Sequence, residues 1–129
     1  MRKNIVIVIL LGMITALIIP RLWKANDKPA NIAWTVEDSK AYAQDALLKW
    51  NQKQWVCLTQ LWGKESAWNP NAYNKIKVMG KNAGGIPQLL GLDPSTPPTQ
   101  QIDRGLAYIY NRYKTPCLAW KHFTKYGWH

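Results

Sequence analysis

One acidic side chain, Glu65, occupies a position where a charged residue is unexpected. It follows Leu58, Leu61 and Trp62 by seven, four and three residues, so on a helix its carboxylate continues an apolar stripe. It also falls in the last turn of that helix, where the helix dipole disfavours an anion by about 0.3–1 kcal/mol. Desolvation between Trp62 and Trp68 would favour the protonated carboxyl group. Such a group is a general acid that can protonate a glycosidic oxygen.

A simpler interpretation has Glu65 turning outward at the helix end and pairing with a lysine. Few other residues could act beside Glu65 as acids, bases or metal ligands. His122 and His129 have no acidic or cysteine neighbour in sequence, so we expect structural or solvated roles for both. Metal-ligand spacings are missing, so we predict no metal site. The other acids of the region after residue 33 are Glu37, Asp38, Asp45, Asp93 and Asp103.

Glu65 opens the first of three sequence blocks that follow one another along the chain. The first block reads ESAWNPNAYN from Glu65 to Asn74, and the second reads AGGIPQ from Ala83 to Gln88. The third begins with GLAYI at 105–109 and extends to His122. Together they resemble the soluble lytic transglycosylase domains that have a goose-type-lysozyme-like fold, in particular their short secreted or phage-encoded members. The resemblance covers roughly residues 50 to 128.

The resemblance implies roles for three residues, and the residue types suggest roles for two more. Glu65 would be the catalytic acid, Gln88 would line the sugar groove, and Tyr108 would hydrogen-bond near the acid. Ser66 either orients the carboxylate or the substrate's acetamido group, or it is only a local backbone partner. We expect Trp68 at the groove rim and most other tryptophans in the core.

The implied reaction needs one carboxylate and no metal or organic cofactor. Glu65 protonates the β-1,4 bond between N-acetylmuramic acid and N-acetylglucosamine in peptidoglycan, the muramic 6-hydroxyl attacks the anomeric carbon, and a 1,6-anhydromuramyl product forms. One alternative is a muramidase whose water is held by Asp93 or Asp103. Another is a non-catalytic peptidoglycan-binding module, because Gly84 replaces an aromatic residue of many members and the stretch 89–98 is shortened. A cationic membrane-disrupting protein would leave the three blocks unexplained.

Helices are expected to position these residues. The predicted fold class is mostly α, a small lysozyme-like helical domain with a loop-rich substrate groove, preceded by an N-terminal hydrophobic helix. Thr35 and Asp38 form a capping-box pattern, and Thr115 precedes a proline. The region from Asn69 to Gly91 is rich in Asn, Gly and Pro, which favours loops with at most a short helix or hairpin. The predicted helices are about 36 to 51, Trp55 to near Trp68, Thr96 to near Lys114, and a short one from Thr115-Pro116.

The two cysteines, Cys57 and Cys117, both follow the apolar amino-terminal segment. A single disulfide is the simplest interpretation, with two buried free thiols as the alternative. The bond would tie the second helix to the last one and would stabilise the domain by roughly 4 kcal/mol.

The amino-terminal region has the pattern of a targeting segment. Positive charge at residues 1–3 precedes an uncharged apolar run from Ile5 to Ile19. No small-residue cleavage site follows, which favours a retained anchor over a cleaved signal. We therefore expect a membrane segment at 1–25, a linker at 26–33 and an extracytoplasmic domain at 34–129, either anchored with its amino terminus in the cytoplasm or secreted.

The chain is strongly basic and short. Its 129 residues allow one domain, and 17 Lys plus Arg against 7 Asp plus Glu give a formal charge of +10. Such a charge attracts anionic partners, among which export makes nucleic acid the least suitable. We expect peptidoglycan strands as the partner, contact with the membrane through residues 5–19, and no nucleic acid.

Overall fold

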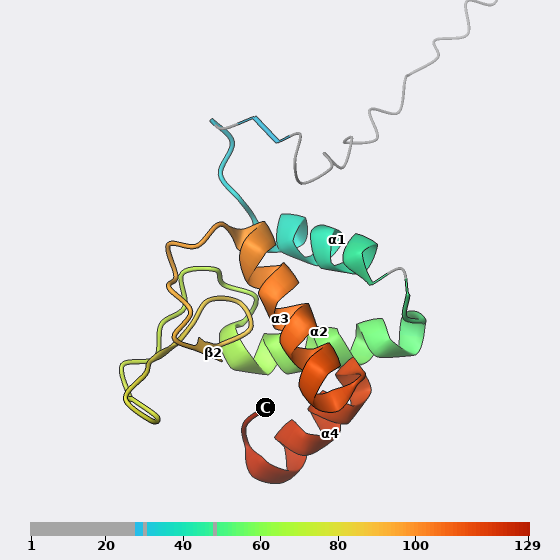
Figure 1. The fold of residues 1–129 in the computed structure, drawn as a ribbon. Helices are drawn as coiled ribbons and strands as arrows, with labels where there is room; N and C mark the ends of the chain where they lie inside the picture. The colour runs from blue at the N-terminus through green and yellow to red at the C-terminus, as the bar shows by residue number, and fades with distance from the viewer. Residues whose placement is uncertain (1–27, 30, 48) are drawn as a thin grey trace, which may run out of the picture.

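The described residues form four helices and one very short hairpin (Figure 1). The computed structural model describes residues 28, 29, 31–47 and 49–129. The mostly α class is confirmed, whereas the predicted segment 1–25 lies outside the described residues. Among the described helices, none is both long and apolar enough to cross a bilayer. The elements are α1 (Val36–Ala46), α2 (Gln52–Ser66), β1 (Ala83–Gly84), β2 (Leu89–Leu90), α3 (Pro98–Tyr113) and α4 (Pro116–Tyr126).

Side-chain caps define most of the helix starts. Thr35 accepts a hydrogen bond from the Asp38 amide, and the Asp38 carboxylate accepts one from the Thr35 amide, so the predicted capping box is confirmed. Asn51 caps α2 by accepting from the Gln54 amide. Thr115 caps α4 in the same way, with the following proline in the first turn.

Three predicted helix limits are wrong. The second helix begins at Gln52 instead of Trp55, directly after its Asn51 cap. The first helix ends at Ala46 instead of continuing to 51, because the chain turns at Leu47 and Asn51 already caps the next helix. The third helix starts at Pro98, with Pro97 as its cap. Pro98 restricts the residue before it to an extended backbone, and Pro97 accordingly has ψ 138°, so the helix cannot begin there.

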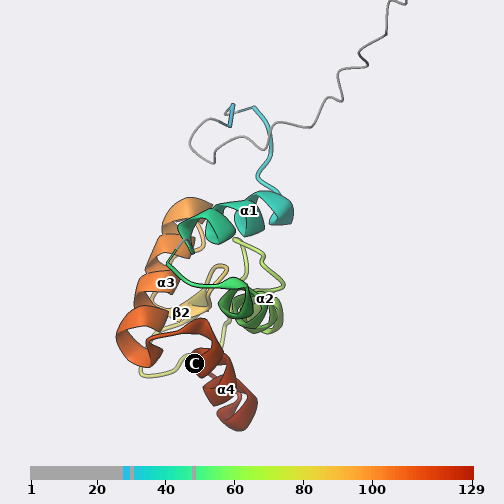
Figure 2. The same cartoon turned by 90° about the vertical axis from the view of Figure 1, so that its right-hand side faces the viewer.

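The core lies where α2, α3 and α4 meet, with α1 packed on α3 (Figures 1 and 2). α2 and α4 form the most extensive helix pair. Trp62 and Trp68 lie at the centre with their rings 5.1 Å apart and nearly perpendicular. The buried apolar side chains of this core are Ala43, Leu47, Leu58, Leu61, Trp62, Trp68, Ile86, Ile102, Ile109 and Ala119.

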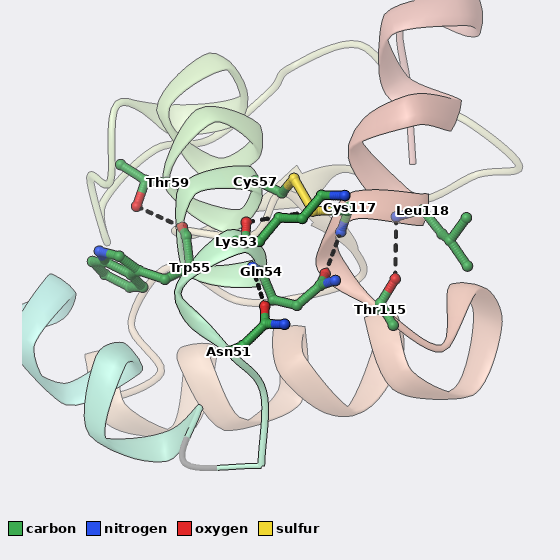
Figure 3. Close-up of a disulfide and its surroundings, with 9 residues drawn as sticks. All are labelled: Asn51, Lys53, Gln54, Trp55, Cys57, Thr59, Thr115, Cys117 and Leu118. Atoms are coloured by element: carbon green, nitrogen blue, oxygen red, sulfur yellow. Dashed lines mark hydrogen bonds between the residues drawn. A yellow bond between two sulfur atoms is a disulfide. The ribbon is translucent and has the colours of Figure 1, made fainter.

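A disulfide joins α2 to α4, as the sequence predicts (Figure 3). Cys57 lies in the second turn of α2 and Cys117 in the first turn of α4. Beside it, the Cys117 amide donates to the Gln54 side-chain oxygen at 2.9 Å. The bond therefore fixes the ends of the two helices that lie away from Glu65, which sits in the last turn of α2.

The segment between α2 and α3 is mostly irregular, again as predicted. Its hairpin pairs Ala83 with Leu90 and Gly84 with Leu89. Figure 1 shows this segment beside the carboxyl end of α2 and the amino end of α3. The irregular segment thus lies beside the end of α2 that carries Glu65.

Candidate functional site

A cavity of about 760 Å³ lies between the irregular segment, the end of α2, the carboxyl-terminal half of α3 and the residues after α4. Glu65 lines it, as do two of the predicted groove residues, Gln88 and Tyr108. Ser66 and Trp68 do not line it. The full lining is Glu65, Asn74, Val78, Met79, Ala83, Gln88, Leu89, Leu90, Tyr108, Arg112, Gly127, Trp128 and His129.

Glu65 points into this cavity from the last turn of α2. Its side chain is 16% exposed, and its Oε1 atom lies 2.7 Å from Nδ1 of His129. The helix ends directly after it, because Ser66 is the last helical residue and Ala67 takes the left-handed conformation. The interpretation in which Glu65 turns outward and pairs with a lysine is wrong, because its partner among the described residues is a histidine.

His129 is buried and contacts an acid in space, although it has no acidic neighbour in sequence. Its side chain is 1% exposed, and its ring meets the Tyr108 ring edge to face at 5.7 Å. Its Nε2 atom is buried and has no hydrogen-bond partner among the described residues. His129 therefore contributes one wall of the cavity and one contact to Glu65.

The chain reaches this position because it reverses after α4. Gly127 caps α4 with φ 76°, a left-handed conformation that glycine adopts without strain. Trp128 then lies between two neighbours: the Arg112 guanidinium is 5.1 Å from its ring, and the His122 ring is 4.5 Å away. The Trp128 carbonyl also contacts Nδ1 of His122 at 2.8 Å. His122 thus has the structural role that we expected for it.

Tyr108 occupies the α3 side of the cavity. Burial raises the pKa of the Tyr108 phenol, despite the opposing effect of the Arg112 guanidinium. The phenol therefore remains a neutral hydrogen-bond donor across the physiological pH range. Its predicted hydrogen bond near the acid stays a prediction, because the contact that the structure places beside Glu65 is the Tyr108–His129 ring pair.

Gln88 and Ser66 are tied to the backbone around the cavity. The Gln88 amide nitrogen donates to the carbonyls of Gly85 at 3.0 Å and Ala72 at 3.3 Å, so the amide oxygen is the atom left to accept from a ligand. The Ser66 hydroxyl donates to the Ile86 carbonyl at 2.6 Å. Of the roles considered for Ser66, the structure places it in the backbone role, where it joins the end of α2 to the segment that carries Gln88.

Trp68 does not form the groove rim that we expected. It is 2% exposed, and its indole packs against Trp55 and Trp62. Its ring N–H donates to the Thr59 carbonyl at 3.3 Å. The backbone of Ala67 and Trp68 is left-handed, with φ 52° and 59°, which turns the chain and directs the indole inward. Trp68 therefore belongs to the core and cannot stack on a ligand.

The two acids proposed to hold a water molecule lie away from Glu65. Asp103 on α3 accepts hydrogen bonds from the Tyr42 hydroxyl at 3.0 Å and joins α3 to α1. Asp93 is exposed and accepts from the Ser95 amide at 2.8 Å. Neither lines the cavity. Among the described residues that line it, Glu65 has the one carboxylate side chain.

Gly84 is explained by packing. A Cβ atom there would lie 2.1 Å from the Leu92 carbonyl oxygen, so this backbone has no room for any side chain. The absence of an aromatic residue at Gly84 therefore follows from close contact between β1 and the chain after β2.

Sequence reasoning missed Gln101, which is fully buried and organises the irregular segment. Its side-chain oxygen accepts from the Ile86 amide at 2.9 Å. Its nitrogen lies 2.8–3.2 Å from the carbonyls of Pro70, Pro94 and Thr96. One amide group thus holds three parts of the segment against α3. The available signal was a polar residue four positions before Gly105, on the buried face of a predicted helix.

The described residues contain no group of three or more His, Cys, Asp or Glu side chains that could hold a metal ion. Comparison of the chain with protein-family models, curated proteins and solved structures gives no match.

Proposed function

We propose that this protein cleaves the glycan strands of peptidoglycan as a lytic transglycosylase of lysozyme-like fold, with Glu65 as its acid and then its base. The observation that carries the proposal is a single partly buried carboxylate in a cavity of about 760 Å³. A cavity of this size accommodates a ligand of a few sugar rings or fewer. The resemblance of the three sequence blocks gives the substrate class.

The surroundings of Glu65 suit a group that must both donate and accept a proton. Its side chain is 16% exposed, and the carboxyl group lines the cavity, where a ligand can reach it. In the proposed reaction Glu65 protonates the leaving glycosidic oxygen. The ionised carboxylate then takes the proton of the muramic 6-hydroxyl as this oxygen bonds to the anomeric carbon.

The arrangement favours this route over the hydrolytic one. An inverting hydrolase needs a second carboxylate about 6.5–9.5 Å from the first to activate water, and a retaining one needs it at about 5–5.5 Å. Asp93 and Asp103 are both engaged outside the cavity. An intramolecular hydroxyl needs no second carboxylate, since the substrate itself supplies the nucleophile.

Digestion of purified sacculi, followed by mass spectrometry of the released fragments, tests the proposal. The parent chain is compared with Glu65→Gln, and with Glu37→Gln as a matched control on the exposed first turn of α1. We expect anhydromuropeptides from the parent and from Glu37→Gln. The Glu65→Gln rate should fall by about 100-fold or more, because proton transfer contributes on that order.

Other outcomes would identify the alternatives. Reducing ends in place of anhydro ends would indicate a muramidase. Binding to sacculi without release of fragments would indicate a binding module. Equal activity of Glu65→Gln and the parent would remove Glu65 from the mechanism.

A further inference from the structure

His129 is the one ionisable side chain in direct contact with the Glu65 carboxyl group among the described residues. We propose that His129 is a positioning residue: neutral and protonated on Nδ1, it donates to Oε1 of Glu65 and so keeps the carboxyl proton on Oε2, the oxygen available to a ligand. This inference rests on the proposed role of Glu65 as the acid.

The burial of the histidine ring selects this protonation state. Nε2 is enclosed and meets no acceptor among the described residues. Leaving a buried N–H unpaired costs about 1–3 kcal/mol, and more if the ring is charged. Both the doubly protonated ring and the Nε2–H tautomer would place an unpaired N–H there. Only the neutral Nδ1–H tautomer uses its one N–H in the observed contact with Glu65.

The direction of this hydrogen bond decides where the carboxyl proton lies. If Nδ1 were the acceptor, the proton would have to lie on Oε1 and point at the histidine, away from any ligand. With Nδ1 as the donor, Oε1 is an acceptor and the proton must be carried by Oε2. The other ionisable groups that line the cavity, Tyr108 and Arg112, both project from α3.

The same hydrogen bond stabilises the ionised state that follows proton donation. Oε2 gives its proton to the glycosidic oxygen as the bond to the anomeric carbon breaks, and the carboxylate then receives the proton of the 6-hydroxyl as the anhydro bond forms. Glu65 ends the cycle protonated, while His129 neither gains nor loses a proton. Its N–H becomes a charge-assisted donor while Glu65 is ionised, and such bonds are roughly twice as strong as neutral ones.

The position of His129 is fixed by the residues before it. Trp128 is held between Arg112 and His122, and Gly127 sets the chain reversal that brings the ring to Glu65. The ring is therefore held on the carboxyl group by residues that form one wall of the cavity.

The first test is nuclear magnetic resonance of the full chain carrying ¹⁵N-labelled histidine rings, at neutral pH. The chain contains two histidines, so comparison with His129→Asn assigns both sets of signals. We expect the Nδ1–H tautomer for His129. An Nε2–H tautomer or a doubly protonated ring would overturn the inference, and this readout needs no turnover. It therefore decides on His129 even if the sacculus digestion shows that the proposed function is wrong.

The second test compares His129→Asn with His129→Leu. The asparagine side chain places an N–H donor near the position of Nδ1, whereas leucine fills space without a donor. We expect kcat of His129→Leu to fall by about 10- to 100-fold, since small misplacements of a reacting group cost this much. KM should change by less than about twofold, and His129→Asn should retain most of the parent's kcat. Equal loss in both variants, or a kcat of His129→Leu close to the parent's, would overturn the inference. Thermal unfolding of each variant identifies any loss caused by misfolding.

Discussion

Replacing Gln101 by leucine should destabilise the protein far more than the same change at the next residue before it. Gln101 is fully buried and its amide group contacts four backbone groups, whereas Gln100 on the same helix is exposed. The two substitutions are chemically identical and differ only in surroundings. Gln100→Leu is therefore a matched control for the loss of the buried amide.

The size of the effect follows from the hydrogen bonds. Loss of the Gln101 oxygen leaves the buried Ile86 amide unpaired, at a cost of about 1–3 kcal/mol. Loss of the two N–H donors removes bonds to surrounding carbonyls that contribute about 1 kcal/mol each. The apolar surface of leucine offsets about 1 kcal/mol of this. We therefore expect the free energy of unfolding to fall by about 3 kcal/mol for Gln101→Leu, and to change by less than about 0.5 kcal/mol for Gln100→Leu.

Urea denaturation followed by tryptophan fluorescence measures both values. The Ile86 amide lies in the 83–90 hairpin and bonds to Gln101, so Gln101→Leu should also raise the hydrogen-exchange rates of the hairpin amides. A difference between the two variants of less than about 1 kcal/mol would refute the account of Gln101 as the side chain that holds the irregular segment.

Two further predictions concern the frame around the site. Replacing Cys57 and Cys117 by serine should lower the free energy of unfolding by about 4 kcal/mol, since the disulfide closes a loop with a sequence separation of 60. Calorimetry measures this loss, and a value below about 1 kcal/mol would contradict the prediction. Gly84→Ala should cost about 1–3 kcal/mol because its Cβ would lie 2.1 Å from a carbonyl oxygen. Gly63→Ala, in α2 with no atom within 4 Å of the added carbon, should instead stabilise by about 1 kcal/mol, so similar effects of the two glycine changes in denaturant would refute the packing argument.

The parts of the fold that depend on neighbours in sequence could be predicted. Thr35 with Asp38 and Thr115 with Pro116 define helix starts through contacts within a few residues, so their patterns are visible in the sequence. The disulfide was predictable because the chain offers only one pairing.

The wrong limit of the first helix has a specific cause. Trp50 lies seven residues after Ala43, the spacing of one helix face, although it packs on the core from the turn between α1 and α2. A spacing pattern cannot distinguish a helical residue from one that a turn returns to the same side. The Asn51 cap was the signal that should have ended the helix earlier.

The site depends on features that the sequence does not display. Two consecutive left-handed residues, Ala67 and Trp68, turn the indole into the core, although neither is glycine. The contact between Glu65 and His129 joins residues 64 positions apart, and only the docking of α4 on α2 brings them together. Gln101 was detectable by the argument that identified Glu65, because both are polar residues on the buried face of a helix.

The residues around the cavity differ in how well they should tolerate substitution. Residues 74–90 form the wall on one side of the cavity. Several side chains of this wall are exposed and lie outside the core, among them Val78, Met79 and Leu90. The helices behind this wall are packed together, and a disulfide joins α2 to α4. The Gln101 side chain holds the irregular segment by bonding to backbone groups of that segment. Substitutions in the wall can therefore accumulate during evolution, or be introduced by design, and change which ligands fit while the frame that positions Glu65 stays the same.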